Sequence, residues 1–131
     1  MFLLDTNICI YIIKKNPFAV LKKLQTKKIS EVAISAVTLA ELQFGVEKSL
    51  YKEKNQFALN QFLAPLEVLH FEEKAAQYFG KIRADLEKRG KPIGVFDMMI
   101  AAHALSLEAI LVTNNEKEFS RVQDLKIENW K

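Results

Sequence analysis

Short apolar runs alternate along this chain with longer segments in which apolar residues recur every three or four positions. Runs such as Phe2-Leu3-Leu4 predict short strands that are buried on both faces. The longer segments predict helices with one apolar face. The predicted strands cover residues 2–4, 32–34, 66–69, 109–113 and 125–128. The predicted helices cover residues 8–13, 17–27, 36–48, 52–62, 72–88, 96–105 and 116–119.

Polar and helix-breaking residues mark the boundaries between these elements. Asn16 is expected to cap the second helix with Pro17 in its first turn, and Ser35 is expected to cap the third helix. Arg89-Gly90-Lys91-Pro92 ends the longest helix. Strands that alternate with helices are typical of a mainly parallel sheet with helices on both faces. We therefore expect an α/β fold and, because no linker is visible, one domain over residues 1–131.

The amino-acid composition limits the classes of protein to which the chain can belong. The chain has 131 residues, of which 50% are hydrophobic and 27% are charged, which is typical of a folded globular domain. Its apolar runs are too short to cross a bilayer, and no secretory signal is visible. Cys9 is the single cysteine, so no internal disulfide can form and we expect a cytoplasmic protein. The net charge of +3 permits nucleic-acid binding without requiring it.

An acidic residue directly follows the first predicted strand. Asp5 stands between Phe2-Leu3-Leu4 and the helical run that begins at Ile8. Open α/β sheets bind their ligands at the carboxyl ends of their strands, which makes Asp5 a candidate site residue. The same position also suits a residue that only caps the following helix.

Two further acids interrupt apolar helix faces. Asp97 shares its face with small residues such as Ala101, and Glu41 shares its face with Val37 and Phe44. An unpaired carboxylate that is buried in such surroundings costs several kcal/mol, so each acid needs a partner. The helix N-terminus would satisfy Asp97, and Glu41 would reach water by extending its side chain. A bound metal ion is the alternative that satisfies both.

The predicted topology brings the acids to one edge of the sheet. A very short loop joins helix 96–105 to strand 109–113, so Asp97 is expected near the far end of that strand. Glu118 follows the same strand end, and the other two acids follow the first two strands. Because the carboxyl ends of parallel strands share one edge, we expect all four acids to converge there.

Converged carboxylates repel one another, and a hard divalent cation relieves that repulsion. Oxygen ligands suit Mg²⁺ or Mn²⁺. Zinc is disfavoured because Cys9, His70 and His103 lack the spacing of zinc ligands, and we expect both histidines to be structural. No serine or cysteine has an adjacent base that would make it a nucleophile.

Four segments of the chain, taken together, carry a family resemblance. They are Phe2–Asn7, Thr38–Gly45, Pro92–Ala104 and Leu111–Phe119. In this order and at this spacing they resemble the PIN-domain family and, more narrowly, the VapC-type toxin ribonucleases of bacterial type II toxin–antitoxin systems. The resemblance continues to Ile127–Trp130 and so covers almost the whole chain.

The resemblance implies a Mg²⁺-dependent endoribonuclease in which metal-activated water hydrolyses phosphodiester bonds of structured RNA such as transfer RNA. Mn²⁺ would be a possible substitute for Mg²⁺. The catalytic and metal-binding acids would be Asp5, Glu41, Asp97 and Glu118. Glu118 takes the fourth role because Asn115, where many PIN domains carry an aspartate, has no charge. The residues that would orient the acids are Thr6, Asn7, Thr113 and Asn115.

The resemblance also implies partners. A cognate small antitoxin would bind the chain, two copies would form a homodimer, and no membrane would be involved. An amphipathic antitoxin helix would lie against apolar residues of the early helices, such as Tyr11, Phe18 and Tyr51. The alternative is a non-catalytic α/β module that binds a protein partner and uses its acids only as caps. A lack of hydrolysis in the presence of metal would favour that alternative.

Overall fold

Five parallel strands form the central sheet in the computed structural model, which describes residues 1–131. Their order across the sheet is β3-β2-β1-β4-β5. The strands are β1 (Phe2–Leu4), β2 (Val32–Ser35), β3 (Glu67–Leu69), β4 (Ile110–Val112) and β5 (Ile127–Glu128). The helices are α1 (Thr6–Lys14), α2 (Phe18–Gln25), α3 (Ala36–Glu47), α4 (Lys52–Leu63), α5 (Glu73–Lys88), α6 (Val95–Ser106) and α7 (Glu116–Phe119), with a 3₁₀ turn at Ile29–Glu31. The predicted α/β fold is confirmed.

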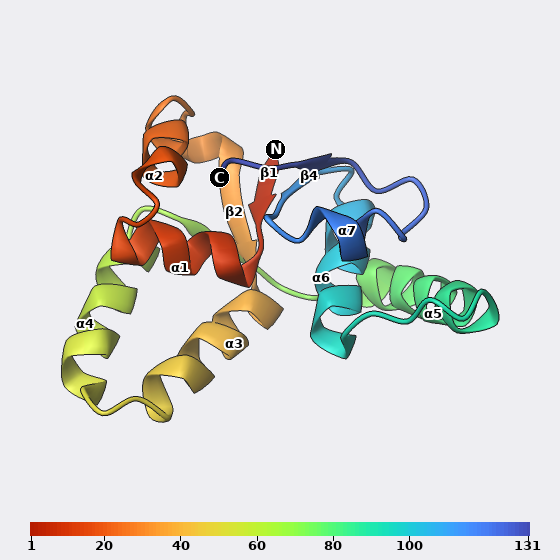
Figure 1. The fold of residues 1–131 in the computed structure, drawn as a ribbon, viewed down its shortest axis with the longest axis horizontal. Helices are drawn as coiled ribbons and strands as arrows, with labels where there is room; N and C mark the ends of the chain where they lie inside the picture. The colour runs from red at the N-terminus through yellow and green to blue at the C-terminus, as the bar shows by residue number, and fades with distance from the viewer.

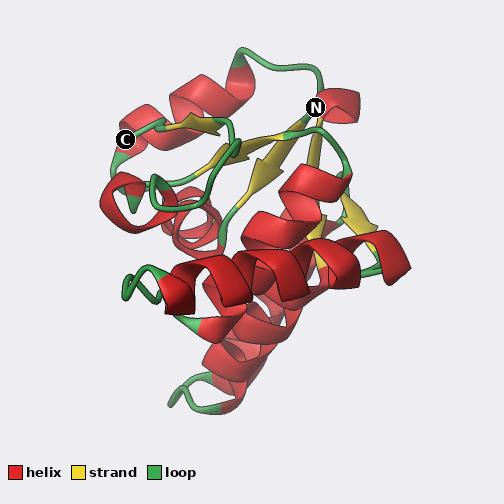
Figure 2. Ribbon diagram, turned by 90° about the vertical axis from the view of Figure 1, so that its right-hand side faces the viewer, coloured by secondary structure: helices red, strands yellow, loops and turns green.

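The sheet separates two hydrophobic cores, because successive residues of a strand point to opposite faces. Leu3 of β1 packs with residues of α5 and α6, whereas Leu4 packs with residues of α1, α3 and α4. Figure 1 shows these two groups of helices on opposite sides of the strands, and Figure 2 shows the sheet between them. This arrangement explains why β1 is apolar at every position.

Helix α6 is buried around most of its circumference. Ile100, Ala101, Ala102 and Ala104 are fully buried between the sheet and neighbouring helices. Small side chains allow this close approach, which fixes the helix against the sheet. The middle of α6 is therefore held against the sheet, and its more exposed first turn extends from this anchored part.

The structure corrects two predicted helix starts. Asn16 does not cap α2, because Pro17 is the N-cap residue and lies before the first helical turn. The backbone N–H of Asn16 is used instead to close α1, where it donates to the carbonyl of Tyr11. Helix α1 begins at Thr6, two residues earlier than predicted. None of the seven helices has the length and apolar content needed to span a bilayer.

Leu111→Ala is expected to lower the free energy of unfolding by about 2–5 kcal/mol, because Leu111 lies fully buried in the central part of the sheet. Leu50→Ala is the matched control: Leu50 is 93% exposed, so its truncation should change the stability by less than about 0.5 kcal/mol. Urea denaturation followed by circular dichroism measures both changes. Similar values for the two variants would contradict the position of β4 in the core.

Candidate active site

Asp5 occupies the junction between β1 and α1 and is 4% exposed. Its backbone N–H donates to the carbonyl of Val112 at 3.0 Å, which continues the pairing of β1 with β4. Its Oδ1 accepts from the backbone N–H of Ile8 at 2.9 Å, so Asp5 caps α1. The hydroxyl of Thr113 also bonds to the carboxylate. Asp5 is therefore both a helix cap and a buried acid at the ligand edge of the sheet.

Burial raises the pKa of Asp5 from 3.8 to about 6. The bonds from Thr113 and from the backbone N–H groups of Ile8 and Asn7 stabilise the charged form, and the negative charge of Glu41 disfavours it. The hydrogen bonds to Asp5 therefore do not fully compensate the hydration free energy that its carboxylate loses on burial. Asn7, which is exposed, contributes through its backbone.

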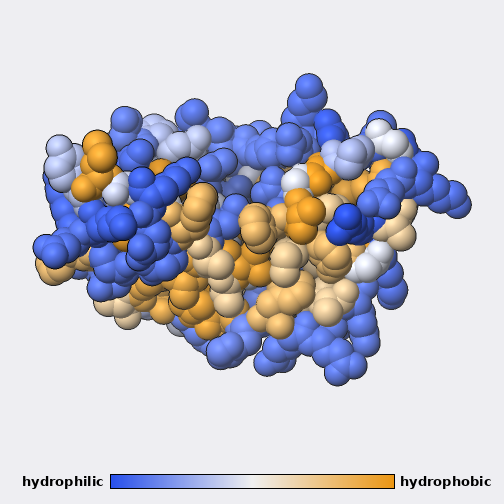
Figure 3. Space-filling view, turned by 90° about the horizontal axis from the view of Figure 1, so that it is seen from below, coloured by the Kyte–Doolittle hydropathy of each residue, from blue (hydrophilic) through white to orange (hydrophobic).

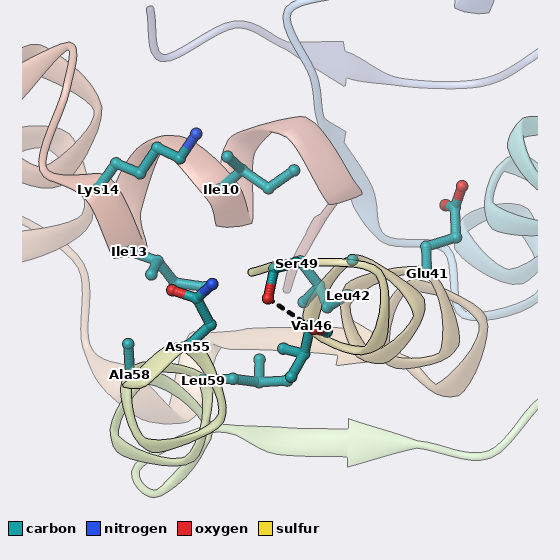
Figure 4. A pocket seen from close by; sticks show the side chains of 11 residues that line it. Ile10, Ile13, Lys14, Glu41, Leu42, Val46, Ser49, Asn55, Ala58 and Leu59 are labelled. Atoms are coloured by element: carbon teal, nitrogen blue, oxygen red, sulfur yellow. Dashed lines mark hydrogen bonds between the residues drawn. The ribbon is translucent and has the colours of Figure 1, made fainter. Parts of the chain in front are cut away.

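Glu41 projects from the middle of α3 and is held by α1. Its Oε1 accepts a hydrogen bond from the hydroxyl of Thr6 at 2.6 Å. Figure 4 shows the Glu41 carboxylate pointing away from the apolar side chains of the neighbouring cleft. The side chain of Glu41 is therefore anchored to the residue that follows Asp5, and it does not simply extend into water.

Asp97 lies in the first turn of α6, three residues after the N-cap residue Gly94. It is half-buried, and no lysine or arginine pairs with it. Its pKa is raised from 3.8 to about 6 by burial and then by the negative charges of Glu41, Asp5 and Glu118. Asp97 therefore lies where the fields of the other three acids overlap.

Glu118 is positioned by the turn that follows β4. The side-chain amide of Asn115 donates to Glu118 Oε2 at 3.1 Å. The backbone N–H of Asn115 donates in turn to the hydroxyl of Thr113 at 2.9 Å. Asn115 therefore orients the acid in α7, while Thr113 links that turn to Asp5.

The four acids have no cationic partner in the fold. The three salt bridges of the structure involve Glu47, Asp85 and Glu87 and lie on the exposed surface. At their present spacing, no three acidic, histidine or cysteine side chains form a group that could hold a metal ion. The site is thus a set of carboxylates that repel one another and that no cation of the fold neutralises.

Three buried polar residues near these helices were not among the predicted site residues. Ser35 was expected only as a cap, and it does accept from the backbone N–H of Val37 at 3.0 Å, but it also contacts the ring of His103 at 2.8 Å. The hydroxyl of Thr38 is buried in α3 without a partner. In the sequence, such residues are visible only as polar positions within apolar segments. That pattern does not identify the partner of each residue.

A cleft with a volume of about 300 Å³ lies beside the acids, between α1, α3 and α4 (Figure 4). Apolar side chains cover most of its wall, and Lys14 and Glu41 are among its polar lining residues. The apolar lining residues are Ile10, Ile13, Leu42, Val46, Ala58 and Leu59. The cleft therefore joins an apolar surface to the acidic site.

Comparison with known proteins places this fold and site in a family. The PIN domain family matches residues 2–125. The chain is 47% identical over 131 residues to ribonuclease VapC2 of Rickettsia felis, covering 99% of this chain and 98% of the relative. It is 45% identical over 129 residues to the tRNA(fMet)-specific endonuclease VapC of Shigella flexneri, covering 98% and 97%. The crystal structure of Rickettsia felis VapBC2 bound to a promoter DNA fragment superimposes with a TM-score of 0.93 at 45% identity, covering 99% and 98%.

The parallel sheet with acids at its carboxyl edge, together with this match, defines a PIN domain. The chain belongs to the PIN-domain family and, within it, to the VapC ribonucleases. Nucleases of this family generally depend on divalent metal ions.

Asp97→Asn is expected to raise the melting temperature near pH 7.5 and to change it little near pH 4. Because the pKa of Asp97 is about 6 in the folded protein and 3.8 ordinarily, the folded state binds this proton more tightly than the unfolded chain. Stability therefore falls as the pH rises from about 4 to 6, and the penalty persists above that range. Asparagine carries no charge and avoids the penalty. Thermal melts between pH 4 and 8 in the presence of a chelator measure this difference.

Asp85→Asn serves as the control, because Asp85 pairs with Arg89 on the surface and lies outside the acidic site. The change in melting temperature that Asp85→Asn causes should not follow the pH profile expected for Asp97→Asn. A loss of stability in Asp97→Asn at every pH would mean that the Asp97 carboxylate mainly stabilises the N-terminus of α6, and it would contradict the repulsion described above.

Proposed function

We propose that this protein is a Mg²⁺-dependent endoribonuclease, with Mn²⁺ as a substitute, and the toxin of a toxin–antitoxin pair. It consists of one nuclease domain over residues 1–131 and hydrolyses structured RNA such as transfer RNA in the cytoplasm. The observation that carries this proposal is the overlap of the charges of Asp5, Glu41 and Glu118 at Asp97. The named activities of its VapC relatives support it.

The donor set fits a hard divalent cation. All four candidate ligands offer carboxylate oxygens, and no cationic side chain neutralises them. Mg²⁺ keeps several of its waters and is usually held directly by only one or two carboxylates. A hydrated ion therefore does not require all four carboxylates in direct contact with it. When bound, such an ion activates water for attack and neutralises charge that develops on the phosphate.

Each acid is held in position by a different set of neighbouring groups. Thr113 and the N-terminus of α1 fix Asp5, while Thr6 fixes Glu41. Asn115 fixes Glu118 from the turn after β4. Asp97 is held by its place in the first turn of α6.

Because Asp5 and Asp97 have a pKa of about 6, binding of a cation to these acids would release protons near that pH.

Asp5→Asn and Asp97→Asn are each expected to reduce RNA cleavage to background while the fold survives. Asparagine retains the capping ability of residue 5 and removes only its charge. The assay incubates purified protein with total RNA, with Mg²⁺, with Mn²⁺ or with a chelator, and maps the cut ends. Asp85→Asn, outside the acidic site, should cleave as the unaltered protein does.

Cleavage by either aspartate variant at a near-normal rate would show that the substituted aspartate is not an active-site residue. A complete lack of cleavage by the unaltered protein with both metals would favour the alternative function, a non-catalytic module that binds a protein partner.

We also propose that the apolar cleft between α1, α3 and α4 receives an amphipathic helix of a small antitoxin. Its lining is mainly apolar and its rim is charged. Solved relatives are complexes named VapBC. None of the three early residues expected at this surface lines the cleft. Phe18 and Tyr51 are 60% and 69% exposed elsewhere, whereas Tyr11 is half-buried and bonded by Asn114.

The proposed homodimer would use another face. Figure 3 views the molecule from below and shows apolar surface across the middle of that face. The loop between α3 and α4 and the first turn of α6 reach this side of the molecule (Figure 1). Both carry large exposed apolar side chains, which are Leu50, Tyr51, Val95 and Phe96. A second copy would remove this surface from water.

Ile13→Glu is expected to abolish co-purification with the small protein encoded beside this gene, because it places a charge in the wall of the cleft. Ile29→Glu is the matched control, since Ile29 is 48% exposed and does not line the cleft. Light scattering of the purified chain and complex gives their copy numbers. The toxin assignment would fail if the unaltered chain bound no such protein and caused no growth defect when expressed alone.

A further inference from the structure

The buried ring of His103 connects three separate segments of the chain. Its Nδ1 lies 2.8 Å from the hydroxyl of Ser35, which is 68 residues away in sequence. The backbone of His70, between β3 and α5, also lies close to the ring and acts to raise its pKa against the effect of burial. Its ring meets Phe71 edge-on, with 5.6 Å between the ring centroids. His103 and Ser35 are 2% and 0% exposed, so water does not compete for these bonds.

The Ser35 hydroxyl makes two contacts at once. Its Oγ accepts from the N–H of Val37 and also pairs with Nδ1 of His103. A hydroxyl has one proton and two lone pairs, so both bonds can be made at the same time. Burial lowers the pKa of His103, which favours the neutral ring.

This network lies between the helices that carry two of the acids. Ser35 caps α3, which carries Glu41, whereas His103 belongs to α6, which carries Asp97. No other side-chain hydrogen bond in the structure joins α3 or its cap to α6. The relative position of Glu41 and Asp97 therefore depends on apolar packing and on this one directional contact.

We propose that Ser35 and His103 are positioning residues that set the spacing of Glu41 and Asp97 for cation binding. The inference rests on the proposed metal-dependent function and extends it to two residues that touch neither the metal nor the RNA. Groups that orient metal ligands commonly change the affinity for the metal by about 10- to 100-fold when they are replaced. The directional contact of His103 with Ser35 makes it such a group, although it touches neither carboxylate.

The test measures Mn²⁺ binding to the full chain by isothermal titration, at a temperature where every variant is folded. His103→Leu removes the hydrogen bond to Ser35 and should weaken Mn²⁺ binding about tenfold or more. His103→Asn keeps an acceptor close to the position of Nδ1 and should restore most of the affinity. Ser35→Ala combined with His103→Leu should weaken binding no further than either alone, because both act through one bond.

Phe71→Leu is the matched control, because it alters the packing of the same ring without removing a hydrogen bond between the helices. It should lower the melting temperature and leave Mn²⁺ affinity unchanged. The inference is overturned if Phe71→Leu weakens Mn²⁺ binding as much as His103→Leu does, or if His103→Leu leaves the affinity unchanged. Either result would give His103 a purely structural role.

A second measurement needs no metal. Spin labels at Glu47→Cys on α3 and Phe96→Cys on α6 report the distance between the helices, in labelled protein diluted with an excess of unlabelled protein. Cys9 is buried and stays unlabelled. The distance distribution should broaden in His103→Leu and remain narrow in Phe71→Leu. If the unaltered chain bound no Mn²⁺ but these distances changed as expected, the proposed function would fail while the positioning of α3 and α6 by His103 would stand. An unchanged distribution in His103→Leu overturns the inference.

Discussion

Electrostatic repulsion at one edge of a parallel sheet is the constraint around which this protein is built. The topology places four carboxylates at the carboxyl ends of the strands, where no basic side chain relieves them. Folding therefore has to hold together charges that would separate if they were free. The compensating free energy comes from two apolar cores, one on each face of the sheet. Buried apolar residues of β1, β2 and β4 belong to both cores.

The neutral groups around the acids explain how repelling charges keep defined positions. Each of Asp5, Glu41 and Glu118 accepts a hydrogen bond from a hydroxyl, an amide or the end of a helix. Such donors stabilise a carboxylate without cancelling its charge, so the negative potential remains available to a cation. A lysine in the same place would stabilise the fold better and would remove the reason for a cation to bind.

The sequence predicted the order of strands and helices because their apolar runs have clear periods and lengths. It also predicted which acids lie at the sheet edge, since Asp5 and Glu41 follow directly from the strand–helix order. The prediction that Asn16 caps α2 was wrong, because the N–H of Asn16 closes α1 instead. Local residue preferences do not show which of two neighbouring helices such a residue serves. It did not predict the contact of Ser35 with His103 or of Thr6 with Glu41, because pairs 68 and 35 residues apart depend on how helices pack.

The position of β1 has a consequence for the order in which the protein is made. Strand β1 lies in the middle of the sheet, and its neighbour β4 is made more than 100 residues after it, as the pairing of Phe2 with Ile110 shows. Asp5 is fixed by Val112 and Thr113, so its surroundings are completed only after β4 has emerged. A nascent chain that stops before β4 contains three of the four acids without the strand that aligns them. Assembly of the proposed nuclease site is thereby delayed until β4 and the turn that follows it have been made.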